Sequence, residues 1–218
     1  AFSKTVRRPT FVELATTNTS KVLRLLLEHL WLTFIAVFLA TVVAVPLGIA
    51  MTRRPSLQFV LLGIAGVLQT IPSLALLAFM IPLLGMNVWT AICSLFLYSL
   101  LPILRNTHTG ISGVEPDLVD AAHGMGMRDS EVLKRVQLPL ALPTIMAGIR
   151  TATVICIGVA TLAAFVGAGG LGELIVEGLY LNDTGLILLG AIPAAALAVS
   201  ADFLLGRVHD KLRSPGVT

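Results

Sequence analysis

The sequence predicts an all-α, polytopic membrane protein with five transmembrane helices. Three observations carry this prediction: 56% of the 218 residues are hydrophobic, only 12% are charged, and the mean hydropathy is +0.92. A soluble domain has about 25% charged residues. Long uncharged runs separate the charged segments, and a helix of about 20 apolar residues is what crosses a bilayer's ~30 Å of hydrocarbon. A helical bundle in lipid therefore explains the composition better than a soluble core.

Charge and cysteine content exclude several other classes. The 15 Lys and Arg and 12 Asp and Glu give a net charge of +3, and long stretches hold no basic residue. Nucleic-acid-binding domains gather such residues on one face, so no nucleic-acid partner is expected. Cys93 and Cys156 lie in apolar runs without a CxxC or CxxH pattern. We expect them to be small buried side chains and predict no metal site.

The first three predicted spans follow from the uncharged runs. Residues 30–52 contain no charge, and the run ends at two arginines. Residues 57–84 form the second run, in which we expect Pro72 to bend or loosen the helix because proline removes a backbone N–H. Residues 88–104 form the third, which stops at Arg105.

Two further spans follow the polar segment 106–143. They cover residues 144–166 and 184–205. We therefore expect an extracytoplasmic or interfacial N-terminal segment (1–29), a transmembrane domain (30–205) and a cytoplasmic tail (206–218).

The distribution of Lys and Arg predicts the orientation. Five crossings put the turn after span one, the polar segment and the C-terminus on the same side, and the two inter-span connections on the other side hold no basic residue. Ten of the 15 basic residues fall on the first side: Arg53, Arg54, Arg105, Arg128, Lys134, Arg135, Arg150, Arg207, Lys211 and Arg213. The N-terminus is therefore expected outside and the C-terminus in the cytoplasm. Five basic residues oppose this, but they are mixed with glutamates: Lys4, Arg7, Arg8, Lys21 and Arg24.

The polar segment between spans three and four carries the strongest functional pattern. A short helix is predicted over 118–125, with Pro116 near its start and Asp117 as its N-cap. Ala121 and Ala122 leave one face of this helix shallow. Such a face suits the groove of another protein, whereas the alternative is a solvated connector.

A second short helix is predicted over 129–137. Gly126 permits a turn before it that a residue with a Cβ would resist. Acidic residues near the start of this helix suit its positive end. We expect the helix to stop at Pro139.

From Asp120 the segment has the pattern Asp-Ala-Ala-x3-Gly-x9-Val-x-Leu-Pro. It resembles the Glu-Ala-Ala loop of ABC importer permeases, in which Glu and Ile stand where this chain has Asp120 and Val136. All fixed spacings agree, and both replacements keep charge or branching. In that family the loop docks into a separate ATP-binding subunit. The resemblance therefore implies a docking role for Asp120, Ala121, Ala122, Gly126, Val136, Leu138 and Pro139.

A narrower resemblance covers most of the chain, from about residue 30 to residue 212. Five segments are similar to permeases that import glycine betaine, carnitine, choline or related betaines: 69–75 (QTIPSLA), 101–107 (LPILRNT), 147–153 (AGIRTAT), 163–172 (AAFVGAGGLG) and 190–193 (GAIP). The resemblance implies a MetI-like permease fold in the bacterial inner membrane. It also implies two ATP-binding subunits, a second permease subunit, identical or homologous, and a separate substrate-binding protein.

The chain holds no Gly-x4-Gly-Lys-Ser/Thr motif to cradle a nucleotide. ATP and Mg²⁺ are therefore expected on a partner subunit, with no cofactor and no catalytic residue on this chain. Gly167-x-Gly169-x-x-Gly172 has the letters of a dinucleotide fingerprint, but no strand precedes it. We expect these glycines to turn the chain at the outer mouth.

Polar residues inside the spans are candidates for the solute pathway. Gln69, Thr70 and Ser73 flank the proline break, and helix packing is the alternative role for the same groups. Arg150 and Asp202 lie in the cytoplasmic thirds of spans four and five. Charged groups in lipid need partners, so we expect these two to pair or to reach the interface, with substrate contact as the alternative.

Two other functions stay open at this point. One is an ABC permease for another small solute, such as an amino acid. The other is a secondary transporter working without ATP, which is expected to contain an inverted repeat, and none is visible.

An intramembrane enzyme would need a nucleophile and base within the spans, and none is found. The four histidines lack ligand spacing and are expected at surfaces or interfaces outside the spans: His29, His108, His123 and His209.

Overall fold

The computed structural model describes residues 10–212, and over this range the chain is helical, without a strand. The all-α prediction is confirmed. Parts of the expected N-terminal segment 1–29 and tail 206–218, with Lys4, Arg7, Arg8 and Arg213, lie outside the described residues.

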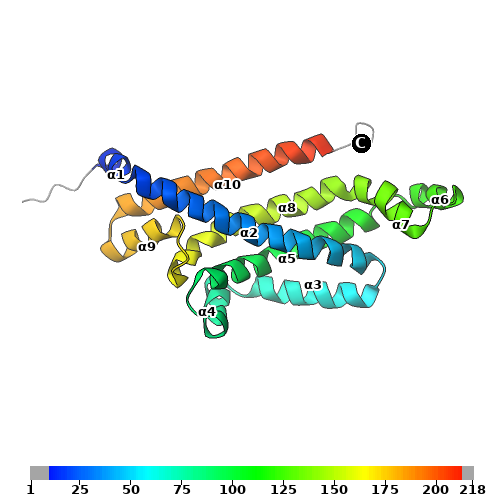
Figure 1. The fold of residues 1–218 in the computed structure, drawn as a ribbon, viewed down its shortest axis with the longest axis horizontal. Coiled ribbons are helices and arrows are strands. Elements are labelled where there is room, and N and C mark those ends of the chain that lie inside the picture. The colour runs from blue at the N-terminus through cyan, green and yellow to red at the C-terminus, as the bar shows by residue number, and fades with distance from the viewer. Residues whose placement is uncertain (1–9, 213–218) are drawn as a thin grey trace, which may run out of the picture.

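The molecule is an elongated bundle (Figure 1). α2 (Thr19–Thr52), α5 (Val88–Ser112), α8 (Leu138–Ala160) and α10 (Thr184–Leu212) run along its length. α6 (Pro116–Gly124) and α7 (Asp129–Val132) form one end, whereas α1 (Phe11–Thr17) and α9 (Gly172–Leu181) lie at the other. α3 (Pro55–Thr70) lies beside α5, and α4 (Ser73–Leu84) turns across the bundle.

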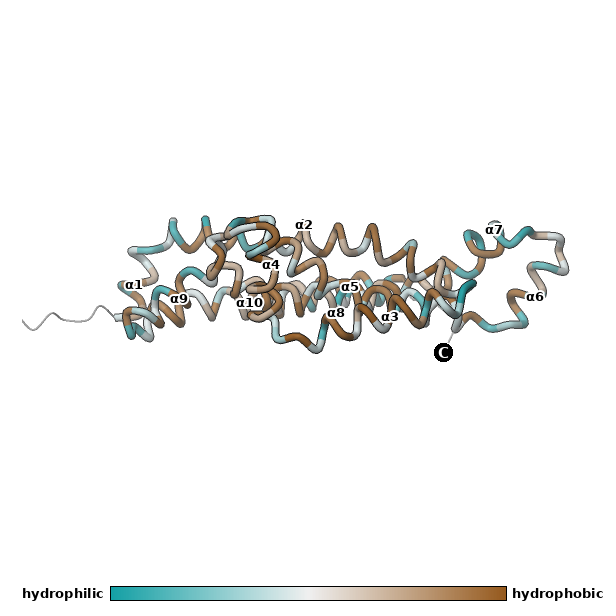
Figure 2. Tube along the Cα trace, turned by 90° about the horizontal axis from the view of Figure 1, so that it is seen from below, coloured by the Kyte–Doolittle hydropathy of each residue, from teal (hydrophilic) through white to brown (hydrophobic). Residues whose placement is uncertain are grey.

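Up to five helical stretches are long and apolar enough to cross a membrane. Four are continuous, Thr19–Thr52, Val88–Ser112, Asp129–Val166 and Thr184–Leu212, and the fifth is the bent pair α3 and α4. Figure 2 shows hydrophobic residues along α2 and α3, and hydrophilic ones gathered near α1 at one end and near α6 and α7 at the other. The helices extend past the uncharged runs. A helix that emerges from the hydrocarbon can carry charged residues there and still keep its backbone hydrogen bonds.

The second span is broken at Pro72, as the sequence predicts. α3 ends at Thr70, Ile71 and Pro72 are extended, and α4 leaves at an angle of 104°. A residue before proline is pushed out of the helical region. The carbonyl of Ile71 accepts a hydrogen bond from the Tyr98 hydroxyl on α5, and Gln69 donates to the Tyr98 carbonyl at 3.2 Å. α5 therefore holds the break in place.

Glycines allow α2, α5 and α8 to approach one another closely. A Cβ built on Gly48 of α2 would lie 2.6 Å from the Cβ of Thr107 on α5. On α8, a Cβ at Gly148 would lie 2.6 Å from the Cβ of Asn106 and 2.8 Å from the carbonyl oxygen of Pro102. Small residues at helix crossings are the usual basis of packing in membranes. α5 is thus held between its two neighbours.

The expected helix end at Pro139 is wrong. The helix continues from Asp129 through α7, a π-helical turn (Leu133–Gln137) and α8 to a 3-10 segment (Thr161–Val166). Proline clashes with the carbonyl four residues before it. In the π-helical turn the Leu138 N–H bonds instead to the Leu133 carbonyl, five residues back. This wider turn is a local adjustment of the kind that accommodates proline within a continuous helix.

His29 is buried within α2, a helix long and apolar enough to span a membrane, so the expectation that it lies at a surface or interface outside the spans is wrong. Its Nε2 lies 3.0 Å from the carbonyl oxygen of Ile157. At its end α8 becomes tighter: the backbone N–H groups at the C-cap, Thr161, bond to the carbonyls of Gly158, three residues back, and Val159. Because a carbonyl can only accept, the Nε2 of His29 donates. The buried Nδ1 has no partner among the described residues.

Candidate docking hairpin and solute pathway

α6 and α7 form a helical hairpin at one end of the bundle, here called the docking hairpin (residues 116–132). α6 begins with Pro116 and is preceded by Glu115 as its N-cap residue, without a side-chain cap. The prediction of Asp117 as N-cap is therefore wrong. Because proline takes the first helical position, Asp117 falls inside the first turn, where its carboxylate favours the positive end of the helix.

Gly126 turns the chain between the two helices. Its φ is +82°, a conformation that favours glycine, and its N–H donates to the His123 carbonyl at 2.8 Å. The next N–H, of Met127, donates to the Ala122 carbonyl at 3.2 Å. The turn predicted from the sequence is present, and it closes α6 with its own backbone.

The hairpin is attached to the bundle by a few contacts. Ala122 and Val132 are buried, and Nη2 of Arg53, at the end of α2, donates to the carbonyl of Asp129 at 3.4 Å. Glu131 accepts a hydrogen bond from the Arg128 N–H at 3.0 Å, which fixes the start of α7.

The seven residues of the Glu-Ala-Ala-like pattern do not share one surface. Asp120, Ala121, Gly126 and Pro139 are exposed, Val136 and Leu138 are half-buried, and Ala122 is buried. Ala122 therefore packs the hairpin internally, while the exposed members are free to contact another protein.

Sequence reasoning missed two exposed apolar residues of the hairpin. Leu118 is 44% exposed and Met125 is 71% exposed. Together with exposed Ala121 they stand at positions i, i+3 and i+7 of one helical face. The spacing was visible in the sequence, but only the structure tells which face of α6 packs on the bundle. An apolar face at the tip of a polar hairpin suits a protein partner.

The three candidate pathway residues lie around the proline break. Gln69 bonds to α5 as described, and the Thr70 hydroxyl donates to the Val67 carbonyl at 2.7 Å. Ser73 borders a small apolar gap with Leu77 and Leu95. The side-chain N–H of Gln69 and the hydroxyl of Thr70 are thus engaged within the protein.

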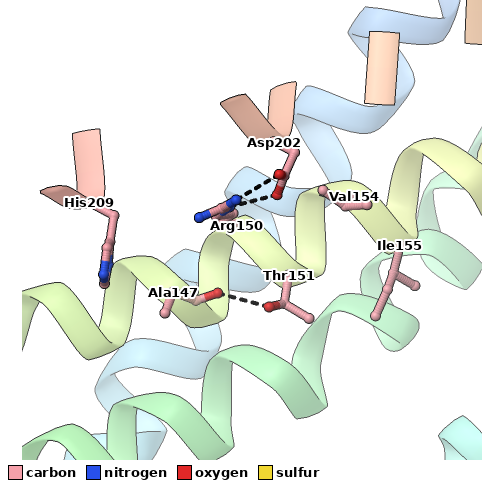
Figure 3. A pocket seen from close by; sticks show the side chains of 7 residues that line it. All are labelled: Ala147, Arg150, Thr151, Val154, Ile155, Asp202 and His209. Carbon is pink, nitrogen blue, oxygen red and sulfur yellow. Dashed lines mark hydrogen bonds and ion pairs between the residues drawn. The ribbon is translucent and has the colours of Figure 1, made fainter. Parts of the chain in front are cut away.

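Arg150 on α8 and Asp202 on α10 are brought together in a two-pronged ion pair (Figure 3). Nε of Arg150 lies 2.6 Å from Oδ1 of Asp202, and Nη2 lies 2.6 Å from Oδ2. The side chains are 36% and 44% exposed. Gly206, one turn beyond Asp202, lies behind the guanidinium: a Cβ there would be 3.1 Å from Nη1.

The ion pair borders a cavity of about 360 Å³ between α8 and α10, here called the α8–α10 cavity. Toward the hairpin end, Nδ1 of His209 lies 2.9 Å from the carbonyl oxygen of Pro143, which ties α10 to α8 a second time. The cavity is lined by Ala147, Arg150, Thr151, Val154, Ile155, Asp202 and His209 (Figure 3). Within residues 10–212 no group of His, Cys, Asp and Glu could hold a metal ion.

Four continuous apolar helices together with the bent pair α3 and α4, a polar hairpin at one end and an ion-paired cavity describe a polytopic membrane protein. The chain belongs to the family described as binding-protein-dependent transport system inner membrane component, whose model matches residues 44–214. It is therefore a multi-pass permease subunit of a multi-component ABC import system in the inner membrane, and the family predicted from the sequence is confirmed.

Named relatives match nearly the whole chain. The choline transport system permease protein OpuBB of Bacillus subtilis (strain 168) is 48% identical over 206 residues, covering 94% of this chain and 95% of the relative. The glycine betaine/carnitine/choline transport system permease protein OpuCB of the same organism is 49% identical over 190 residues, covering 87% and 88%. The osmoprotectant import permease protein OsmW of Salmonella typhimurium (strain LT2) is 43% identical over 205 residues, covering 92% and 95%.

Solved structures show the same fold. The inward-facing MetNI methionine ABC transporter has a chain that matches with a TM-score of 0.81 at 22% identity, covering 88% of this chain and 96% of its own length. An amino acid ABC transporter with histidines matches with a TM-score of 0.77 at 18% identity, covering 94% and 99%. The predicted MetI-like permease fold is confirmed.

Proposed function

We propose that this chain is the membrane subunit through which a quaternary-ammonium osmoprotectant, such as choline, glycine betaine or carnitine, enters the cell. The observation that carries the proposal is the identity of 43–49%, over most of the chain, to permeases named for these solutes. The alternative, import of an amino acid, has support only from structures that are about 20% identical, and these speak to the fold alone.

The docking hairpin is the site where a separate ATP-binding subunit attaches. Its loop pattern and the exposed apolar face of Leu118, Ala121 and Met125 support this role. Asp120, Gly126 and Pro139 are exposed nearby, whereas Ala122 supports the hairpin from inside. This end of the bundle faces the cytoplasm, since the basic residues between spans concentrate there.

Two permease subunits form the complete pathway, because α8 and α10 leave a charged, half-exposed pair on an open face. Charged side chains within spans face a bundle interior or water rather than lipid. A second copy or a homologous chain faces α8 and α10 across a shared water-filled pathway, and a separate binding protein delivers the solute at the α9 end.

Transport then follows from the continuity of one helix. The chain is helical without interruption from Asp129 in the docking hairpin to Val166 at the far end. When partner ATPases close on ATP and push two hairpins together, α8 of each subunit moves with its hairpin. Two conformations, open to opposite sides, would differ in their affinity for the partners, and the partners shift the balance between them.

Uptake by the reconstituted complex tests the proposal. The permease, its ATPase and its binding protein are placed in liposomes, and uptake of labelled choline and glycine betaine is measured with and without internal ATP. We expect uptake only when ATP, ATPase and binding protein are all present. Uptake by the permease alone would establish a secondary transporter, and ATP-driven uptake of an amino acid but of neither osmoprotectant would refute the substrate class.

A further inference from the structure

The ion pair of Arg150 and Asp202 has an unusual position for charges in a membrane protein. Both residues lie within predicted spans, yet their side chains are 36% and 44% exposed in the single chain. Lipid is a poor surrounding for such groups, which within spans face the bundle interior or a water-filled cavity. The charges that border the α8–α10 cavity therefore favour water over lipid in that space.

The size and walls of this cavity suit passage of a small solute. Its volume of about 360 Å³ falls in the range of small-molecule sites. Ala147, Val154 and Ile155 make its apolar wall. The hydroxyl of Thr151 already donates to the Ala147 carbonyl at 3.0 Å, so it is not a free donor. Such a wall holds a solute weakly.

The two charges at this wall cancel each other. Each carboxylate oxygen of Asp202 receives one guanidinium N–H of Arg150 at 2.6 Å. The backbone of Gly206 supports the guanidinium from behind, leaving room for the planar group where a side chain would displace it. An unpaired carboxylate here would attract a quaternary ammonium strongly, and an unpaired guanidinium would repel it.

We propose that the α8–α10 cavity is the cytoplasmic vestibule of the solute path, and that the Arg150–Asp202 pair sets its charge selectivity by keeping it electrically neutral. A cation such as choline and a zwitterion such as glycine betaine then cross it with similar ease. The inference rests on the proposed function, because it concerns the same pathway. Arg150 and Asp202 then contribute to solute specificity and do not only link α8 to α10.

Single neutralising variants test the proposal through a ratio of solutes. Asp202→Asn leaves Arg150 positive, so choline uptake falls relative to glycine betaine uptake, whereas Arg150→Gln leaves Asp202 negative and shifts the ratio the other way. With one full charge near the path we expect shifts of about fivefold that shrink at high salt. Both solutes are assayed in the same proteoliposomes, so the amount of folded complex cancels in the ratio.

The pair formed by Lys21 and Glu177 provides the matched control. It joins α2 to α9 at the other end of the molecule, with a distance of 2.7 Å and side-chain exposures of 34% and 42%. Glu177→Gln breaks an equally exposed pair outside the cavity. Weaker delivery by the binding protein at the α9 end would lower the uptake of both solutes together, so the choline-to-betaine ratio stays at the wild-type value. A control shift as large as that of Asp202→Asn would show that the ratio does not report on the cavity, and would overturn the proposal.

Charges added at Thr151 keep the test decisive if the pair variants do not fold. Thr151 is exposed in the same cavity and bonds only to its own helix, so Thr151→Lys and Thr151→Asp change the vestibule's charge and leave the ion pair intact. The proposal is supported if the two Thr151 variants shift the choline-to-betaine ratio in opposite directions. It is overturned if neither variant shifts the ratio or if both shift it in the same direction. If the wild-type complex shows no ATP-driven uptake of either solute, the proposed function fails instead, so the two failures are distinguishable.

Discussion

Gly148 on α8 faces Asn106 on α5 with no room for a side chain between them. A Cβ at Gly148 would stand 2.6 Å from the Cβ of Asn106 and 2.8 Å from the Pro102 carbonyl oxygen, and neither atom is the free end of a flexible group. The close crossing of α5 and α8 at this point therefore requires glycine at position 148.

Gly148→Ala tests this crossing. We expect it to destabilise the subunit by about 1–3 kcal/mol, the usual cost of overpacking, and to lower the temperature at which the detergent-solubilised complex loses its monodisperse peak. Gly63→Ala on α3 is the matched control, because nothing lies within 4 Å of a Cβ there. Equal thermal stability of the two variants would contradict the close packing.

Replacement of His29 separates its hydrogen bond from its bulk. His29→Leu leaves the Ile157 carbonyl without a donor in a buried site, which costs about 1–3 kcal/mol. His29→Gln can present an amide N–H where Nε2 lies, so it should recover most of the lost stability. Thermal denaturation of the complex measures both, and a leucine variant as stable as the glutamine variant would show that the bond is dispensable.

Glu28 holds the glycine turn that follows the 3-10 segment. Its Oε2 accepts a hydrogen bond from the Gly170 N–H at 3.2 Å, and Gly170 has a φ of +83°. Glu28→Ala should raise amide hydrogen exchange across residues 167–171 by about five- to tenfold, as expected for a lost hydrogen bond. Glu13→Ala removes a comparable bond, to the Thr10 N–H in an exposed cap, and should leave this turn unchanged.

The docking hairpin can be tested with two neighbouring glycines. Gly126 has a φ of +82°, whereas Gly124 is helical and has no atom within 4 Å of a Cβ. Gly126→Ala forces an L-residue into the left-handed region, at a cost of about 1–2 kcal/mol, so the ATPase should co-purify less well. Gly124→Ala should leave recovery unchanged. Full recovery of the ATPase with both variants would argue against a docking role for this turn.

The helices of this protein could be predicted from the sequence because burial in lipid leaves a local signature. Runs without charge mark the spans, and Pro72 marks the break, since the lost N–H acts at the residue itself. Pro139 has the same chemistry but no such effect, because a π-helical turn beside it absorbs the clash. Whether a proline bends a helix is thus decided by its neighbours.

The candidate site was only partly predictable. The spacing around Asp120 and Gly126 is local, so it pointed to the hairpin, and the opposite charges of Arg150 and Asp202 in two apolar runs pointed to each other. The apolar face of Leu118 and Met125 depends on which side of α6 packs on the bundle. The burial of His29 depends on a carbonyl 128 residues away. Contacts of this kind leave no pattern in the sequence.

The uninterrupted helix from Asp129 to Val166 has a geometric consequence. Its 38 residues make a rod about 57 Å long at 1.5 Å per residue, nearly twice the thickness of the hydrocarbon layer. Tilting such a rod by about 10° around one tip carries the opposite tip sideways by about 10 Å. Leverage alone thus converts a small rotation into a gap as wide as an organic solute.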